Sequence, residues 1–87
     1  MPLISRFFGI SIKMYFNDHG LPHFHAQYQD FSGVFSINSG RLVLGGLPLD
    51  IVEVVTKWAM NNKPVLMENW KRARSNQQLL WVEGASR

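Results

Sequence analysis

The 87-residue sequence predicts a single α+β domain, in which an antiparallel β-meander of three to four strands is followed by two helices packed on one sheet face. Three observations predict this class. Apolar and polar residues alternate in the first half of the chain. Apolar residues recur at helical spacing in the second half. Short turn sequences, and no long linker, separate the segments, so that residues 1–87 form one domain.

The first two expected strands flank the turn at residues 17–20. Apolar and polar side chains alternate in ISIKMYF, residues 10–16, which is typical of a strand with one buried face. The second strand runs over residues 23–29, where Pro22 suits the strand's start because it has no amide hydrogen to donate. The side chains expected on the buried face of the first strand are Ile10, Ile12, Met14 and Phe16.

A hairpin and two helices complete the predicted order. Residues 33–37 and 41–44 form strands on either side of the turn NSG. Helices are expected over residues 48–61 and 64–75, each opened by a proline. The sequence LLWVEG near the end predicts a short strand or an ordered tail. The residues expected to be mostly buried are Ile12, Met14, Phe24, Phe35, Val55, Trp58, Leu66 and Trp70.

Composition excludes several classes of protein. The chain contains no cysteine, which excludes disulfides, iron–sulfur clusters and thiolate zinc sites and fits a reducing cytoplasm. No apolar run is long enough for a membrane span, and the N-terminus lacks the layout of a signal peptide. The formal net charge of +3 allows RNA, DNA or an acidic protein as partner. We therefore expect a cytoplasmic protein with no membrane partner.

The segment NDHGLPHFH, residues 17–25, carries every histidine of the chain: His19, His23 and His25. Because side chains two apart on a strand share a face, His23 and His25 are expected side by side, with Cα atoms about 6.5 Å apart. Their face is the polar one, opposite the core. His19 lies in the preceding turn, from which it could fold back towards the other two.

Three interpretations of this histidine cluster stay open. As acid–base groups, two histidines could run a metal-independent, ribonuclease-like reaction. As metal ligands, three histidines with an open fourth position would suit a metal-dependent hydrolase, although no distant fourth ligand is evident. As ordinary surface residues, they would only cap a turn and decorate an exposed face. The candidate catalytic residues are Asp18, His19, His23 and His25. The candidate substrate-binding residues are Lys13, Tyr15, Asn17 and Arg41.

The sequence also resembles a known family. The stretch ISRFFGISIKMYFNDHGLPHFHA, the INSG hairpin, LP before a helix, and ENWKRAR together resemble the bacterial domain of unknown function 4160. The most specific part is residues 15–26, in which Leu21 replaces a proline that is frequent in the family. The resemblance implies a small bacterial protein encoded beside a second small protein. It also implies a link to type II toxin–antitoxin pairs, in which some members, the DhiT-like toxins, are the toxin.

These observations give one leading expectation and two alternatives. The leading expectation is a toxin-like protein with a cognate small antitoxin, acting on RNA through the histidine cluster without a cofactor. One alternative is a non-catalytic module that binds protein or nucleic acid through the same face. The other is a hydrolase with a metal ion on the histidines. A small chain rich in aromatic residues is also expected to self-associate, to bind its antitoxin, or both.

Overall fold

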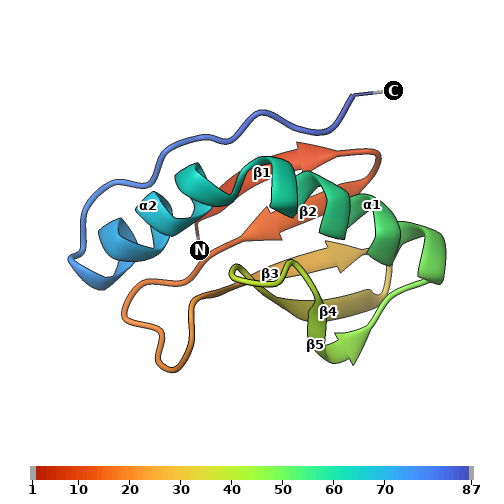
Figure 1. Cartoon of the computed structure of the whole chain (residues 1–87), viewed down its shortest axis with the longest axis horizontal. Coiled ribbons are helices and arrows are strands. Elements are labelled where there is room, and N and C mark those ends of the chain that lie inside the picture. Colours follow the sequence, from red (N-terminus) through yellow and green to blue (C-terminus); the bar gives the residue numbers. More distant parts are fainter. Residues whose placement is uncertain (1, 87) are drawn as a thin grey trace.

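The computed structural model describes residues 2–86, which form a five-stranded antiparallel sheet followed by two helices (Figure 1). The strands follow one another in space as they do in sequence, and the longest connection, residues 14–22, joins β2 to β3. The predicted fold class is confirmed, with one strand more than expected. The elements are β1 Leu3–Phe7, β2 Ile10–Lys13, β3 His23–Tyr28, β4 Phe31–Ser36, β5 Leu42–Gly46, α1 Leu49–Asn61 and α2 Lys63–Arg74.

The additional strand is β1, which pairs with β2 through a tight turn at Phe8 and Gly9. Both turn residues have positive φ, 50° and 76°, as a two-residue hairpin turn requires. Asparagine or glycine usually takes the first of these positions, and here it is a phenylalanine. The sequence therefore carries no ordinary turn signal between the two strands, and the strand was not predicted.

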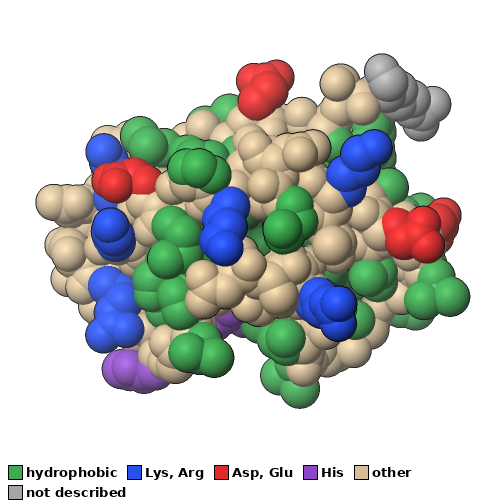
Figure 2. Space-filling model, viewed as in Figure 1, with side chains coloured by type: hydrophobic (Ala, Val, Ile, Leu, Met, Phe, Trp, Pro, Cys, Tyr) green, Lys and Arg blue, Asp and Glu red, His purple; other side chains and the backbone are tan. Residues whose placement is uncertain are grey.

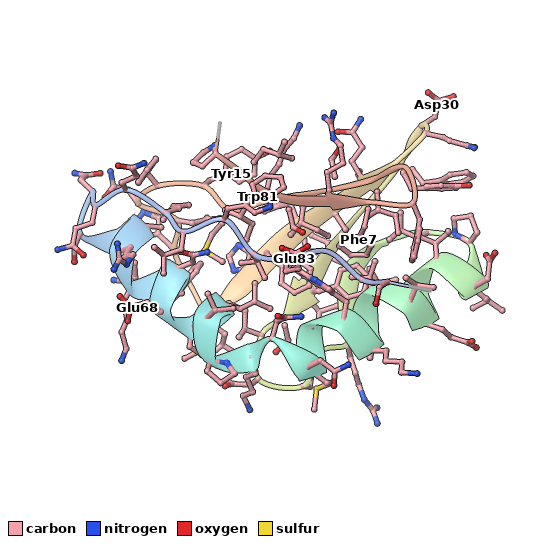
Figure 3. All side chains as sticks on the ribbon, turned by 90° about the horizontal axis from the view of Figure 1, so that it is seen from above. Phe7, Tyr15, Asp30, Glu68, Trp81 and Glu83 are labelled. Carbon is pink, nitrogen blue, oxygen red and sulfur yellow. The ribbon has the colours of Figure 1, made fainter. Side chains whose placement is uncertain are left out.

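The core lies between the helices and one face of the sheet (Figure 3). All eight residues predicted to be buried are at most 5 % exposed. Phe24 and Phe35, on neighbouring strands, stack in parallel with their ring centroids 5.3 Å apart. Trp58 of α1 packs its ring edge-on against Phe24, at 5.8 Å. The opposite sheet face, called the open face below, carries no helix.

The predicted first strand is too long at its C-terminal end. Strand β2 ends at Lys13, and Phe16, which was expected in the core, is 41 % exposed. The chain leaves the sheet because Asn17 adopts a left-handed conformation, φ 57°, and donates its backbone N–H to the carbonyl of Ala73 at the end of α2. A bond to a distant helix thus ends an alternation that the sequence alone would continue.

After α2 the chain runs back in an extended conformation along the β1 edge (Figure 1). No strand is assigned there, but the segment is well anchored. Val82 is buried and donates its N–H to the carbonyl of Ile4, at 2.8 Å. The indole N–H of Trp58 donates to the carbonyl of Glu83, at 2.8 Å. The expected ordered tail is confirmed in this form. No helix within residues 2–86 is long and apolar enough to cross a bilayer.

The amide of Asn69 is the main polar anchor of this tail. Its Nδ2 donates to the Leu80 carbonyl at 2.9 Å, and its Oδ1 accepts the Leu80 N–H at 2.7 Å. We expect Asn69→Ala to lower the free energy of unfolding by about 1–3 kcal/mol, because a fully buried side chain loses both bonds. Urea unfolding would measure this. Asn61→Ala, at an exposed site on α1, is the control and should change little. Equal effects of the two variants would contradict the anchoring role.

Candidate functional site

The turn before β3 is fixed at both ends by backbone hydrogen bonds. At its start, the Asn17 N–H reaches the Ala73 carbonyl of α2 at 3.3 Å. At its end, the Pro22 carbonyl accepts the N–H of Ile37, at 3.0 Å. Between these anchors Gly20 has φ +90°, a conformation that a residue with a Cβ rarely adopts. The turn is therefore tied to both the helix layer and the sheet, and Asp18 lies within it.

His23 and His25 project from β3 on the same side, as strand periodicity predicts. Their ring centroids are 5.3 Å apart. In the sheet, His25 is paired with Lys13 of β2 on one side and with Val34 of β4 on the other. Both histidines are partly buried, whereas Phe24 between them points into the core with no exposed surface.

The carboxylate of Asp18 joins the two histidines into one cluster. Its Oδ2 lies 2.8 Å from Nε2 of His23 and 3.5 Å from Nε2 of His25. Its Oδ1 accepts the backbone N–H of His19, at 3.0 Å. One potential ligand atom from each of Asp18, His23 and His25 lies within 4.8 Å of the other two. These three residues are called the acid–histidine group below.

Both ring nitrogens of His23 face oxygen acceptors. Nδ1 lies 2.8 Å from the carbonyl of Leu21, which can only accept a hydrogen bond, so this nitrogen carries a proton. Nε2 faces the Asp18 carboxylate. Burial, the largest single influence, raises the pKa of Asp18, but hydrogen bonds from the His19 backbone and the His23 ring, with the charge of that ring, outweigh it and lower the pKa overall. The lowered pKa keeps Asp18 ionised, so that its Oδ2 faces the His23 ring as a carboxylate.

His25 differs from His23 in having a ring nitrogen to spare. Its Nε2 is buried, and within residues 2–86 it has no hydrogen-bond partner. The nearest acceptor, Asp18 Oδ2 at 3.5 Å, is too far for a good hydrogen bond. The ring of Tyr15 packs edge-on against His25 with the centroids 4.6 Å apart. His25 is therefore held in place by an aromatic neighbour, while its buried Nε2 is left without a hydrogen bond from the described residues.

The group lies beside a shallow depression of about 300 Å³ on the open face. Lys13, Tyr15 and His25 line it together with residues of β2, β3 and β4 and with Asp30 of the turn between β3 and β4. Tyr15 lies on the sheet side of the molecule, away from the helices (Figure 3). On the other side of the histidines the surface is apolar. The residues lining that second hollow are Leu21, Pro22, His23, Val34, Ser36, Ser39 and Val43.

Five of the eight candidate site residues come together and three do not. Asp18, His23 and His25 form the group, with Lys13 and Tyr15 beside His25. The expected clustering of all three histidines is wrong, because His19 is exposed and does not belong to the group. The turn uses the backbone of His19, not its ring, to contact Asp18.

The other two candidates lie away from the group. The side chain of Asn17 donates to Oδ1 of Asn76, at 3.4 Å, and so contacts the tail. Arg41 is exposed, and its bonds are made by its backbone, to Ser36 and to the Ser39 hydroxyl. Sequence reasoning also missed Trp70, whose ring centroid lies 5.0 Å from that of His23. Its spacing indicated only a core residue of α2, and nothing local indicated that it supports the site.

The comparisons identify a family and no activity. A family model described as a domain of unknown function (DUF4160) matches residues 9–71, which include the whole acid–histidine group and most of α2. No curated protein and no solved structure matches the chain significantly.

Proposed function

Since the chain belongs to the family described as a domain of unknown function (DUF4160), we propose that it is a toxin-like component of a bacterial type II toxin–antitoxin pair, as the resemblance to that family implies. From the site itself we propose that it cleaves RNA at the acid–histidine group. The observation that carries the proposal is the convergence of Asp18, His23 and His25 beside a depression on the open face. A carboxylate and two imidazoles within contact distance are suited to proton transfer near neutral pH.

The contacts support a different role for each member of the group. The His25 side chain is one-third exposed although its Nε2 is buried, so we assign to its other ring nitrogen, Nδ1, the proton exchange with the RNA. His23 has both nitrogens occupied, and therefore acts on the Asp18 carboxylate and not on the substrate directly. Lys13 is the sheet neighbour of His25 and lines the same depression, where its ammonium would neutralise phosphate charge.

The charge of the neighbouring helix supports an RNA substrate. Lys and Arg side chains gather over the α2 end of the molecule (Figure 2). Lys71 and Arg74 in the last turn of α2 are exposed, whereas Arg72 is engaged with Glu68 at 2.9 Å. The hydrogen bond from Asn17 to Ala73 places this helix end beside the turn that carries Asp18. A phosphate backbone crossing these lysine and arginine side chains would arrive at the group.

Apolar surface beside the group supports a protein partner. Leu21, Val43 and Leu44 are between 61 % and 79 % exposed, which is high for large apolar side chains on a small domain. An antitoxin that covered this surface would also block the histidines. The same surface favours a second candidate, a module that only binds protein. The two candidate functions make different predictions for a folded variant that lacks the His25 imidazole. An RNA-cleaving toxin would lose its effect on growth, whereas a module that only binds protein would keep its effect.

Inducible expression in bacteria tests the proposal. We expect growth arrest when the protein is expressed alone, and relief of that arrest when the adjacent gene is expressed with it. Arrest should be followed by colony counts, with the soluble protein quantified in each culture. The His19→Ala variant should arrest growth like the unmodified chain, since its ring lies outside the group. Absence of growth arrest in several hosts at high soluble levels would contradict the toxin proposal.

A further inference from the structure

We propose that the acid–histidine group is a binding site for one divalent transition-metal ion of the zinc class, held by Asp18 Oδ2, His23 Nε2 and His25 Nε2. The inference deepens the proposed function, because it concerns the same three side chains. Two imidazoles and one carboxylate are a frequent ligand set for zinc and for non-haem iron.

The distances fit such an ion with small adjustments. Ligand atoms about 2.0–2.1 Å from a tetrahedral zinc ion lie about 3.3 Å from one another. Asp18 Oδ2 is 2.8 Å from one imidazole nitrogen and 3.5 Å from the other. These distances bracket the required value, and one potential ligand atom from each of the three residues lies within 4.8 Å of the other two. Rotation of the Asp18 carboxylate, on its exposed turn, would open the shorter distance without moving the strand.

The surroundings of the two imidazoles are those of metal ligands. Histidine ligands usually donate their second ring N–H to a carbonyl or carboxylate, which fixes the ring and its tautomer. Nδ1 of His23 has this bond, to the Leu21 carbonyl at 2.8 Å, and directs Nε2 towards Asp18. Nε2 of His25 is buried without a hydrogen-bond partner among the described residues, which is costly unless something binds there. A metal ion would bind this nitrogen and replace the proton between Asp18 and His23.

Three protein ligands would leave at least one position for water or for a phosphate oxygen, as in catalytic zinc sites. The depression beside His25 is lined by Lys13, whose ammonium would attract an anion, and by Asp30, whose carboxylate offsets part of that charge. With an ion on Nε2, the His25 imidazole would no longer be a free acid–base group. Metal binding would therefore change how the group acts on RNA. Proton exchange by His25 would be replaced by activation of the water or phosphate oxygen at the open position of the ion.

Direct binding to the purified, chelator-treated full chain tests the inference without reference to activity. We expect Zn²⁺ to bind with one-to-one stoichiometry in titration calorimetry, and Co²⁺ to give the intense visible absorption of a low-symmetry site. Zn²⁺ should also raise the melting temperature of the unmodified chain, because it binds only the folded group. His25→Ala and Asp18→Asn should each weaken binding by about 100-fold or more.

The histidine outside the group provides the matched control. His19→Ala removes an imidazole from the same turn and should bind Zn²⁺ as tightly as the unmodified chain does. Circular dichroism would confirm that each variant is folded. Absence of one-to-one binding, or equal weakening by His19→Ala, would overturn the inference. Growth arrest that depends on His25 in a chain that binds no metal would overturn the metal site and leave the proposed function intact. Tight Zn²⁺ binding by a chain that arrests growth in no host would overturn the proposed function and leave the metal site intact.

Discussion

Replacing Phe24 with alanine is expected to lower the free energy of unfolding by about 3–5 kcal/mol. Phe24 has no exposed surface, stacks on Phe35, and meets Trp58 of α1 with the ring centroids 5.8 Å apart. Truncation would remove these contacts and leave a cavity between the sheet and α1. Domains of this size have only about 5–15 kcal/mol in total, so the variant should unfold at a much lower denaturant concentration.

A second phenylalanine serves as the control for this prediction. Phe31 begins β4 and is 46 % exposed, so Phe31→Ala should cost much less than Phe24→Ala. Guanidinium unfolding followed by tryptophan fluorescence would measure both, since Trp58 and Trp70 are buried. Similar costs for the two variants would mean that the core does not lie between the sheet and the helices as described.

Replacing His25 with alanine is expected to have the opposite profile, with a large effect on activity and a small one on stability. A proton-transfer group contributes about 10²–10⁴-fold to the rate of its reaction, so the growth arrest should disappear. The side chain is one-third exposed and its Nε2 has no hydrogen-bond partner among residues 2–86, so the free energy of unfolding should change by less than about 1 kcal/mol. Colony counts and thermal unfolding of the same variant provide the two measurements.

Gln27→Ala is the matched control, because Gln27 lies two residues further along β3 and lines the same depression. It should keep the growth arrest. Persistent arrest in His25→Ala, or equal loss in both variants, would contradict the assignment of His25. A large fall in the melting temperature of His25→Ala would instead make the histidine a structural residue.

Periodicity in the sequence was sufficient for most of the fold. The alternation in residues 10–14 and 23–28 correctly separates core positions such as Ile12 and Phe24 from the open face. The helical spacing in residues 51–59 likewise identifies the buried face of α1. These patterns work because burial of a face imposes its period on the sequence. Strand β1 was missed because Phe8 occupies a turn position that usually belongs to glycine or asparagine.

The site was predictable only where it lies on a strand. The two-residue period places His23 and His25 together whatever the surroundings are. Asp18 and His19 lie in a turn, whose shape depends on the bond from Asn17 to the distant Ala73, and no local pattern encodes that bond. The structure therefore directs the Asp18 carboxylate into the group and leaves the His19 ring outside it. Arg41 lies away from the acid–histidine group for a similar reason. Its position depends on the conformation of the turn between β4 and β5, which no local pattern encodes.

The most direct test of the central claim is RNA cleavage by the purified chain, with and without a chelator. The acid–histidine group predicts that the unmodified protein and His19→Ala cut RNA at similar rates, while His25→Ala, folded and at equal concentration, is slower by about 10²-fold or more. Cleavage products would be resolved on denaturing gels. Cleavage by His25→Ala at the rate of the unmodified protein, or no cleavage by the unmodified protein with or without Zn²⁺, would contradict it.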